Sequence, residues 1–473
     1  MKPSPVPASR PFILPPLIVA CALFMENLDS TIIATSLPAI ASDLKQDPIA
    51  LKLALTSYLL AQAVLIPASG WAADRFGTKN VFRGAIVVFT LGSIFCGLSS
   101  TLPQFVAARI FQGCGAAMMT PVGRLTLFRT VERSQIVRAM AYLTIPALIG
   151  PMLGPPLGGF ISTYLHWRWN FWINVPVGIA GVILSSLYIP DIRDENVAAF
   201  DTKGFLLSGL GLSGLIFGLT VLGRGFIDRE LNFALVAAGL VLVALYVRHA
   251  MTAANPILDL RLLGIRTYWA SIVGGFLFRI GVGATPFLLP LLLQLGFGMT
   301  PFQSGLTTFV ATAGALVMKA TAPTALSHFG FRSTLVFNAL ISAAFLAGYG
   351  LFTPGTPQAV LLLALFVGGF FRSLQFTALN ALSFADISAA QMSKATSLSA
   401  VVQQLSLSSG VSIAAAAVEA TRRLSSSGEI QFHDFPPAFF AVAAITASSV
   451  FVFRRLPSNA GASLSGHNPT QES

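Results

Sequence analysis

The sequence contains few charged residues. Only 10% of its 473 residues are Asp, Glu, Lys or Arg, and 54% are hydrophobic, whereas a soluble domain typically carries about 25% charged residues. A helix needs about 20 consecutive apolar residues to cross a hydrocarbon core about 30 Å thick, and such stretches recur along the whole chain. This composition excludes a soluble globular protein and predicts a polytopic, all-α membrane protein with about fourteen transmembrane helices.

The sequence also lacks the residue clusters on which enzymes and ATP-driven pumps depend. Its three cysteines, Cys21, Cys96 and Cys114, lie in apolar segments without the spacing of a disulfide framework or a zinc site, and we interpret them as packing residues. No G-x-x-x-x-G-K-[ST] loop is present, and the largest loops, near 191–203 and 421–434, span only about a dozen residues. We therefore expect no enzyme activity, no cofactor and no metal site.

The excess of basic residues is best explained by orientation in the membrane. The formal charge is +11, but Lys and Arg are spread over short loops, which argues against nucleic acid as a partner. Placing both termini in the cytoplasm leaves most of the loop Lys and Arg residues on the cytoplasmic side, as the positive-inside rule requires. The basic residues 1–10 could begin a signal peptide, but the apolar segment that follows contains Glu26 and Asp29 and lacks a cleavage site. We predict a multi-pass protein of the cytoplasmic (inner) membrane.

Five motifs follow one another in the first part of the chain. They are LDSTIIATSLP (28–38), GWAADRFGTK (70–79), RIFQGCGAA (109–117), GPMLGPPLGG (150–159) and WRWNFWINVPVG (167–178). Together they resemble the motifs of the major facilitator superfamily, specifically of its fourteen-helix drug:proton antiporters. The second half resembles this family mainly in helix count, and RIGVGATPFLLP (279–290) and QFTALN (375–380) are similar to segments of MdtD-type multidrug transporters.

The resemblance implies a major facilitator fold of two six-helix halves plus two additional helices. The corresponding boundaries are an N-terminal six-helix bundle at 1–190, two additional helices at 191–266, a C-terminal six-helix bundle at 267–456 and a disordered cytoplasmic tail at 457–473. A faint internal repeat agrees with related halves, since GWAADRFGTKNVFR after the second span has a degenerate echo in APTALSHFGFR after the tenth.

Two of the motifs have conformational roles in the family. The loop after the second span latches the halves at the cytoplasmic side, and its residues here are Gly70, Asp74, Arg75, Gly77 and Lys79. Thr78 replaces an expected basic residue, which would weaken the latch; a merely solvated basic loop is the alternative. The antiporter signature would bend the fifth span at Gly150, Pro151, Gly154, Pro155, Gly158 and Gly159. A kinked packing helix without a directional role is the alternative there.

Acidic residues inside the predicted spans are candidates for carrying protons. The five histidines lie in loops, at span ends or in the tail, and Glu26 and Asp29 are the carboxylates well inside a span. They are three residues apart and share a helix face, where burial and mutual repulsion favour protonation of one of them. The family motif covers Asp29, and Glu26 is inferred from its position alone. Arg109, in the third motif, is the expected partner, and a permanent structural ion pair is the alternative role.

Cations inside the predicted spans are candidates for binding the substrate. Arg279, Lys319 and Arg372 lie in the second half without matching acids, and Arg124 lies in the fourth span. A buried unpaired cation needs compensation, which a transported carboxylate or phosphate would supply. Snorkelling of the side chain to the membrane interface is the alternative for each of the four.

These observations lead to one functional hypothesis with alternatives. We predict a proton-coupled secondary transporter, an antiporter, that exports small organic molecules or drugs, with a preference for anions as a further hypothesis. Its expected partners are a small-molecule substrate, protons and the lipid bilayer, and a monomer would suffice. A proton-coupled importer of a small organic anion is the nearest alternative. A non-transporting membrane sensor would need a signalling domain or long tails, which we do not find in the sequence.

Overall fold

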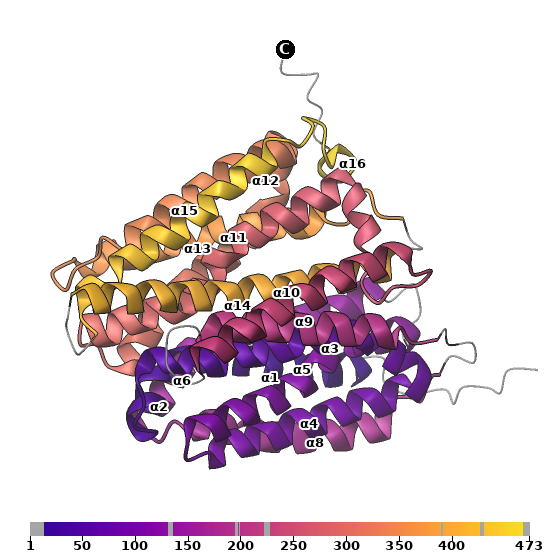
Figure 1. Ribbon diagram of the computed structural model, residues 1–473, viewed down its shortest axis with the longest axis horizontal. Helices are drawn as coiled ribbons and strands as arrows, with labels where there is room; N and C mark the ends of the chain where they lie inside the picture. Colours follow the sequence, from indigo (N-terminus) through magenta and orange to yellow (C-terminus); the bar gives the residue numbers. More distant parts are fainter. Residues whose placement is uncertain are drawn as a thin grey trace, which may run out of the picture.

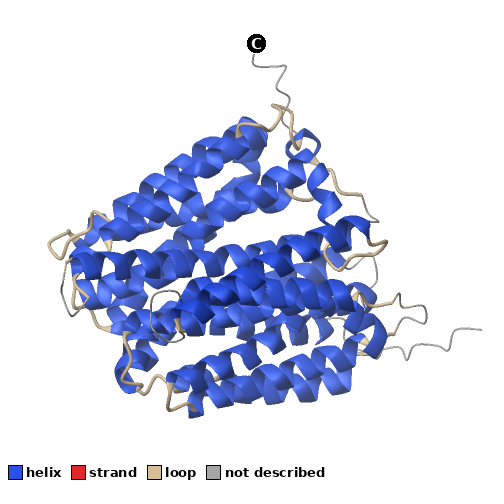
Figure 2. Ribbon diagram, in the orientation of Figure 1, coloured by secondary structure: helices blue, strands red, loops and turns tan. Residues whose placement is uncertain are grey.

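The computed structural model describes residues 14–130, 136–193, 197, 199–221, 228–388, 391–425 and 430–466. Within these ranges every regular element is a helix (Figure 2). The basic start of the chain, 1–10, and the end of the predicted tail, 467–473, lie outside the described residues. The prediction of an all-helical protein is confirmed for the part of the chain that is described.

The helices follow one another with short connections. The first half contains α1 (Leu14–Ile32), α2 (Leu37–Asp43), α3 (Lys52–Phe76), α4 (Thr78–Leu98), α5 (Leu102–Thr130), α6 (Ile136–Tyr164), α7 (Trp169–Trp172) and α8 (Asn174–Tyr188). Two further helices, α9 (Thr202–Val221) and α10 (Arg229–Thr252), come next. The second half contains α11 (Arg266–Leu291), α12 (Pro301–Tyr349), α13 (Gln358–Leu382), α14 (Met392–Leu424), α15 (Pro436–Phe453) and the short α16 (Ala462–Ser465).

Many of these helices are long and apolar enough to cross a bilayer. Among the described residues, 11 helical segments meet this condition by length and composition. That number counts α12 once, although its backbone is broken at Gly330, where φ is 65° and ψ is 169°, and it omits α5 and α6, each 29 residues long. The polytopic membrane protein is confirmed, and the number of fourteen spans stays a prediction.

The two halves form two layers (Figure 1). The first half, indigo to purple, occupies the lower part of the view, and the second half, orange to yellow, occupies the upper part, with α9 and α10 between them. Helices α11 and α15 of the second half are inclined to the helices of the first half and lie farther from them toward α16, whereas α14 runs along α3. At the opposite end one apolar cluster joins them, because Ile33 and Phe105 of the first half belong to it together with Phe287 and Phe439 of the second.

Glycines let α6 approach helices of both halves closely. A Cβ atom at Gly158 would lie 2.3 Å from the carbonyl oxygen of Ile32 on α1, and one at Gly159 would lie 2.3 Å from that of Pro301 on α12. Helices in a membrane associate through such close packing, because there is no hydrophobic driving force between them. The predicted antiporter segment is therefore packed between α1 and α12.

The additional helices α9 and α10 pack against each other and cover a seam between the halves. Gly209 of α9 faces Val64 of α3, and the hydroxyl groups of Thr220 on α9 and Ser412 on α14 are 2.9 Å apart. Because α3 and α14 belong to different halves, α9 contacts both halves at once.

The segment after α15 is partly ordered. Residues 457–473 were predicted to be a disordered tail, but Ala460 is buried, Gly461 adopts a positive φ beside Phe331, and α16 follows. The beginning of this segment is thus packed on the second half.

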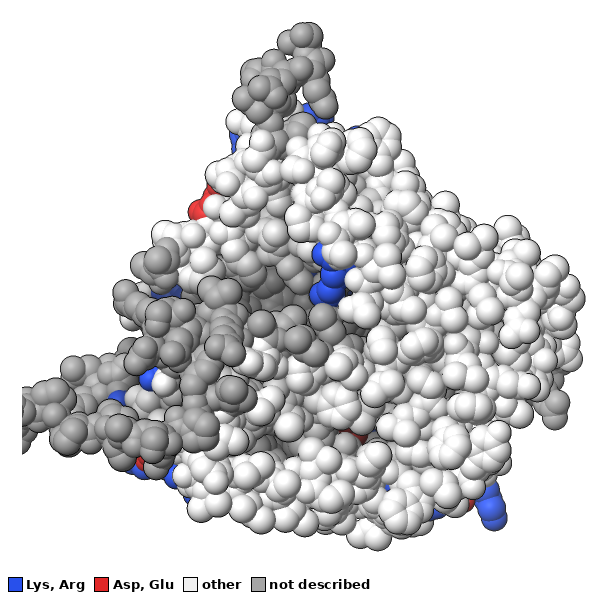
Figure 3. Space-filling view, turned by 180° about the vertical axis from the view of Figure 1, so that it is seen from behind, with Lys and Arg blue, Asp and Glu red and all other residues white. Residues whose placement is uncertain are grey.

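Charged residues are scarce on the outer surface as well. Figure 3 shows one face that is almost free of charged side chains. Its Lys and Arg residues lie at the edges and beside a hollow near the middle. Such an apolar face is the kind of surface that a lipid bilayer covers.

Candidate functional site

A buried ion pair occupies the interior of the first half. The Nη1 atom of Arg109 on α5 lies 2.6 Å from Oδ2 of Asp29 on α1, and the two side chains are 1% and 0% exposed. The guanidinium group also lies 4.0 Å from the ring centroid of Tyr58 and donates to Oε1 of Gln112 at 2.6 Å. The expected partnership of Asp29 and Arg109 is present in the structure.

Amide side chains complete the surroundings of the Asp29 carboxylate. Its Oδ1 atom accepts hydrogen bonds from Gln112 Nε2 at 2.9 Å and from Asn174 Nδ2 at 3.1 Å. The Ser93 hydroxyl oxygen accepts from the same two amides at 3.1 and 2.9 Å. With three donors on a carboxylate that no water reaches, the charged form is well satisfied by hydrogen bonds.

Glu26 lies one turn earlier on α1 and has different neighbours. Its Oε2 atom accepts a hydrogen bond of 2.8 Å from Thr120 on α5, and its Oε1 atom accepts one of 3.4 Å from Gln62 on α3. Gln62 in turn accepts a hydrogen bond from Gln404 on α14. Glu26 is only partly buried, so this carboxylate lies at the boundary between the halves, whereas Asp29 is sealed inside the first half.

The loop after α3 is fastened within the first half. Asp74 on α3 forms an ion pair of 2.6 Å with Arg129 on α5, and the backbone N–H group of Thr78 donates to the carbonyl oxygen of Ile192 at 3.1 Å. Gly77 has a φ of 89° and lies against Asp191 and Arg193, a conformation and a spacing that suit glycine. Among the described residues, the ion-pair partner of Asp74 thus lies in its own half. Gly70 and Arg75 are exposed, and Lys79 is partly exposed.

The four predicted substrate-binding cations do not meet in one place. Arg124 lies one turn beyond Thr120 on α5 and is exposed, and Lys319 on α12 is also exposed, as snorkelling would require. Lys319 lines a groove beside α16 that Arg279 and Arg372 do not line. The positions of the four cations therefore divide them into separate environments.

Arg279 is fully buried and poorly satisfied. Its Nη2 atom donates to Asn380 Oδ1 at 3.3 Å, and its guanidinium group lies 5.3 Å from the Phe376 ring. Its Nε and Nη1 atoms are buried and have no hydrogen-bond partner among the described residues. RIGVGATPFLLP and QFTALN, the two second-half segments that the sequence singled out, thus meet at this arginine.

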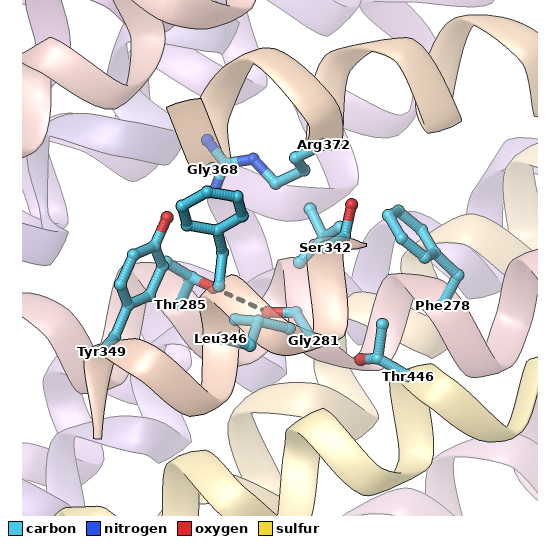
Figure 4. A pocket seen from close by; sticks show the side chains of 11 residues that line it. Phe278, Gly281, Thr285, Ser342, Leu346, Tyr349, Gly368, Arg372 and Thr446 are labelled. Carbon is cyan, nitrogen blue, oxygen red and sulfur yellow. Dashed lines mark hydrogen bonds between the residues drawn. The ribbon is translucent and has the colours of Figure 1, made fainter. Parts of the chain in front are cut away.

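Arg372 lines a small cavity inside the second half (Figure 4). The cavity is bounded by helices α11, α12, α13 and α15, and its polar walls come from Thr285, Ser342, Tyr349 and Thr446. The Ser342 hydroxyl group is buried and has no hydrogen-bond partner in the described part of the chain. Among the described residues, no acidic side chain lines this cavity.

Sequence reasoning did not select several residues of the Asp29 and Glu26 surroundings. Gln112 and Asn174 lie inside recognised motifs, so their presence in apolar spans was an available signal. Ser93, Gln62 and Gln404 lie outside all motifs, and their roles depend on contacts between distant segments.

Comparison with known proteins shows similarity along most of the chain. The family model described as Major Facilitator Superfamily matches residues 19–411. A relative from Escherichia coli O6:H1 named multidrug resistance protein MdtD is 38% identical over 454 residues, covering 93% of this chain and 94% of the relative. A relative of the same name from Serratia proteamaculans is 41% identical over 397 residues, covering 84% and 83%.

Solved structures with the same fold are more distant in sequence. A D-xylose-proton symporter has a TM-score of 0.66 and 14% identity, covering 94% of this chain and 98% of that chain. The human organic anion transporter MFSD10 has a TM-score of 0.59 and 14% identity, covering 94% and 100%. These likenesses support the fold described above.

Proposed function

Because the chain belongs to the major facilitator superfamily, and is therefore a membrane transporter and not an enzyme, we propose that it is a proton-coupled antiporter that exports small organic molecules. Its relatives are named for multidrug resistance, which supports small organic molecules as substrates and export as the direction. The observation that carries the proton coupling is the contrast between the two carboxylates of α1. Asp29 is sealed in an ion pair, and Glu26 is accessible and connected to the other half.

A proton on Asp29 would weaken the tie between α1 and α5. The neutral carboxyl group loses the Coulomb attraction to Arg109, and one of its oxygens becomes a donor in a place where three donors now converge. Two conformations that differ in these contacts have different affinities for a proton. Proton binding can therefore shift the equilibrium between them, as alternating access requires.

Glu26 is the proposed entry point for that proton. It lies on the same face of α1 as Asp29, one turn away, and it is the more exposed of the two. Its hydrogen bond with Gln62, which is bonded to Gln404 of α14, makes this group sensitive to the relative position of the halves. A change in its protonation would therefore accompany a change at the boundary between the halves.

The packing of α6 offers a route for transmitting the change. Its glycines bring it into contact with α1 at Ile32 and with α12 at Pro301, and Pro151 and Pro155 interrupt its backbone hydrogen bonding. A displacement of α1 would press on α6, and through it on the second half. The loop at Asp74 would bias the same equilibrium from its own side of the molecule.

A preference for anionic substrates is supported by two cations in the interior of the second half. Within the described part of the chain, two guanidinium nitrogens of Arg279 have no partner, and no acidic side chain lines the cavity of Arg372. An anionic group would provide the missing acceptors. We place the protein in the cytoplasmic membrane with both termini in the cytoplasm, where a proton gradient is available to drive export.

The proposal can be tested by vesicles that contain the purified protein and an internal pH indicator. In vesicles that are more acidic inside, an antiporter releases protons as it takes up substrate, and a protonophore abolishes this uptake. Uptake driven by the opposite gradient would indicate symport and contradict the exporter. Matched anionic, neutral and cationic compounds should be compared for their competition with proton movement, and stronger competition by the cations would contradict the anion preference.

A further inference from the structure

The second half has a partly buried cation, Arg372, where the first half has a buried one, but it lacks the carboxylate. In the first half, the first, third, fourth and sixth long helices are α1, α4, α5 and α8, and they meet around the pair of Asp29 and Arg109. In the second half the equivalent helices are α11, the part of α12 after Gly330, α13 and α15. They meet around the cavity that Arg372 lines. The same place in the two bundles thus holds an ion pair in one half and a cation beside a cavity in the other.

The place of the missing acid can be identified on α11. In the first half, Asp29 precedes Pro38 in LDSTIIATSLP, and at the same spacing in the second half Gly281 precedes Pro290 in RIGVGATPFLLP. Gly281 lines the cavity of Arg372. A residue without a side chain therefore stands at the position of the first half's carboxylate. A Cβ atom at Gly281 would lie 2.4 Å from the Thr446 hydroxyl oxygen and 2.6 Å from Leu346 Cδ1, so this position has no room for an acidic side chain of its own.

Two polar groups around the cavity, those of Arg372 and Ser342, lack an acceptor among the described residues. Arg372 has neither a hydrogen bond nor an ion pair with any described residue. Ser342 is buried, at 5% exposure, and its hydroxyl group has no partner among the residues that the structure describes. The hydroxyl groups of Thr285 and Thr446 donate to carbonyl oxygens of their own helices. A guanidinium group and a free hydroxyl group that share a cavity are donors suited to one carboxylate.

We propose that this cavity, which Gly281 and Arg372 line, binds the carboxylate group of a transported molecule, and that this group supplies the negative charge that Asp29 supplies in the first half. Arg372 pairs with the carboxylate, and Ser342 donates a hydrogen bond to it. This inference rests on the proposed transport function, because it assigns a chemical class to the substrate. In this arrangement the first half contains its own carboxylate, Asp29, which exchanges a proton. The second half pairs its cation with the carboxylate of the substrate.

Binding can be measured without transport. The purified protein in detergent is titrated with sodium butyrate in place of sodium sulfate at constant ionic strength, and butyramide and sodium chloride serve as neutral and inorganic probes. Butyrate should raise the thermal unfolding temperature and give a calorimetric Kd, and butyramide should do neither. Arg372→Gln should weaken butyrate binding about thirtyfold or more, as loss of one partner of a desolvated charge pair does.

A second variant keeps the proposal testable if Arg372→Gln does not fold. Ser342→Asp supplies a carboxylate from the protein itself, so it should raise the unfolding temperature and abolish the response to butyrate. Ser342→Asn, which has the same size without the charge, should not raise the unfolding temperature. No preference of the unaltered protein for butyrate over butyramide, or undiminished butyrate binding in Arg372→Gln or Ser342→Asp, would overturn the assignment. So would a response to chloride alone. Butyrate binding through Arg372 in a protein that moves no protons would instead leave this site standing and refute the proposed antiport.

Discussion

Replacing Asp29 with Asn should remove both a structural tie and the proposed proton carrier. The variant keeps the shape of the side chain, but Arg109 loses its charged partner at 2.6 Å in a place where the two side chains are 1% and 0% exposed. Removing one partner of a buried ion pair costs about 3–5 kcal/mol. In addition, the two oxygens of Asp29 accept hydrogen bonds from three donors. An Asn side chain has one oxygen and one NH2 group, so its NH2 group would face at least one of these donors. We expect the free energy of unfolding to fall by at least about 3 kcal/mol.

A double variant separates the structural effect from the functional one. Arg109→Gln in the Asp29→Asn background removes the unpaired cation, so it should recover part of the lost stability, while proton-driven transport stays absent because no carboxylate is restored. Stability is measured by thermal unfolding in detergent, and transport by pH-gradient-driven uptake into vesicles. Asp43→Asn is the matched control, because Asp43 pairs with Arg168 at 2.7 Å with 33% and 22% exposure, and such exposed pairs contribute about 1 kcal/mol or less. If Asp29→Asn were as stable as this control and also kept its transport activity, Asp29 would neither stabilise the contact between α1 and α5 nor carry the proton.

Three further outcomes are expected. Glu26→Gln should cost less than about 1 kcal/mol in unfolding free energy, since hydrogen bonds to a partly exposed side chain persist, yet it should flatten the pH dependence of proton-driven uptake; an unchanged pH profile would remove Glu26 from the pathway. Asp74→Asn breaks the half-exposed pair with Arg129 and should lower turnover more than substrate affinity, and a proportional loss of equilibrium binding would contradict a conformational role. Burial raises the pKa of Asp201, but hydrogen bonds from two backbone N–H groups and from His249 outweigh it and hold this pKa below its usual value. The stabilisation that this carboxylate provides is present above its unfolded-state pKa and is lost as the pH falls through the lowered folded-state pKa, so unfolding of Asp201→Asn should depend less on pH in that acidic range than unfolding of the unaltered protein.

The fold could be predicted from the sequence because hydrocarbon imposes a simple rule. Long apolar stretches must become helices, and five motifs in order identified the first half. The pairing of Asp29 with Arg109 could also be anticipated, since a buried acid and a buried base from recognised motifs stabilise each other.

The other contacts of the candidate site could not be predicted, because they depend on how segments that are distant in the sequence pack together. Gln62 and Gln404 are bonded across 342 positions of the chain, and no local pattern indicates such a contact. Lys319 and Arg372 occupy comparable apolar stretches of sequence, yet one is exposed and the other lines an interior cavity. Which side chains of a helix face the interior depends on the rotation of the helix about its own axis. Packing against the neighbouring helices sets that rotation.

The position of α9 and α10 should make the movement of the halves depend on the thickness of the bilayer. The outer face of α10 is apolar and exposed at Leu231, Phe233, Leu240, Val241 and Leu245, so this pair of helices must match its apolar length to the thickness of the surrounding lipid. A thinner or thicker bilayer tilts such helices at a modest cost per ångström of mismatch, and α9 carries that tilt to Val64 of α3 and to Ser412 of α14 on either side of the seam. The acyl-chain length of the lipid should therefore affect transport. The turnover of the transporter should pass through an optimum in vesicles of increasing acyl-chain length. Shortening the apolar stretch of α10 should shift that optimum toward thinner membranes.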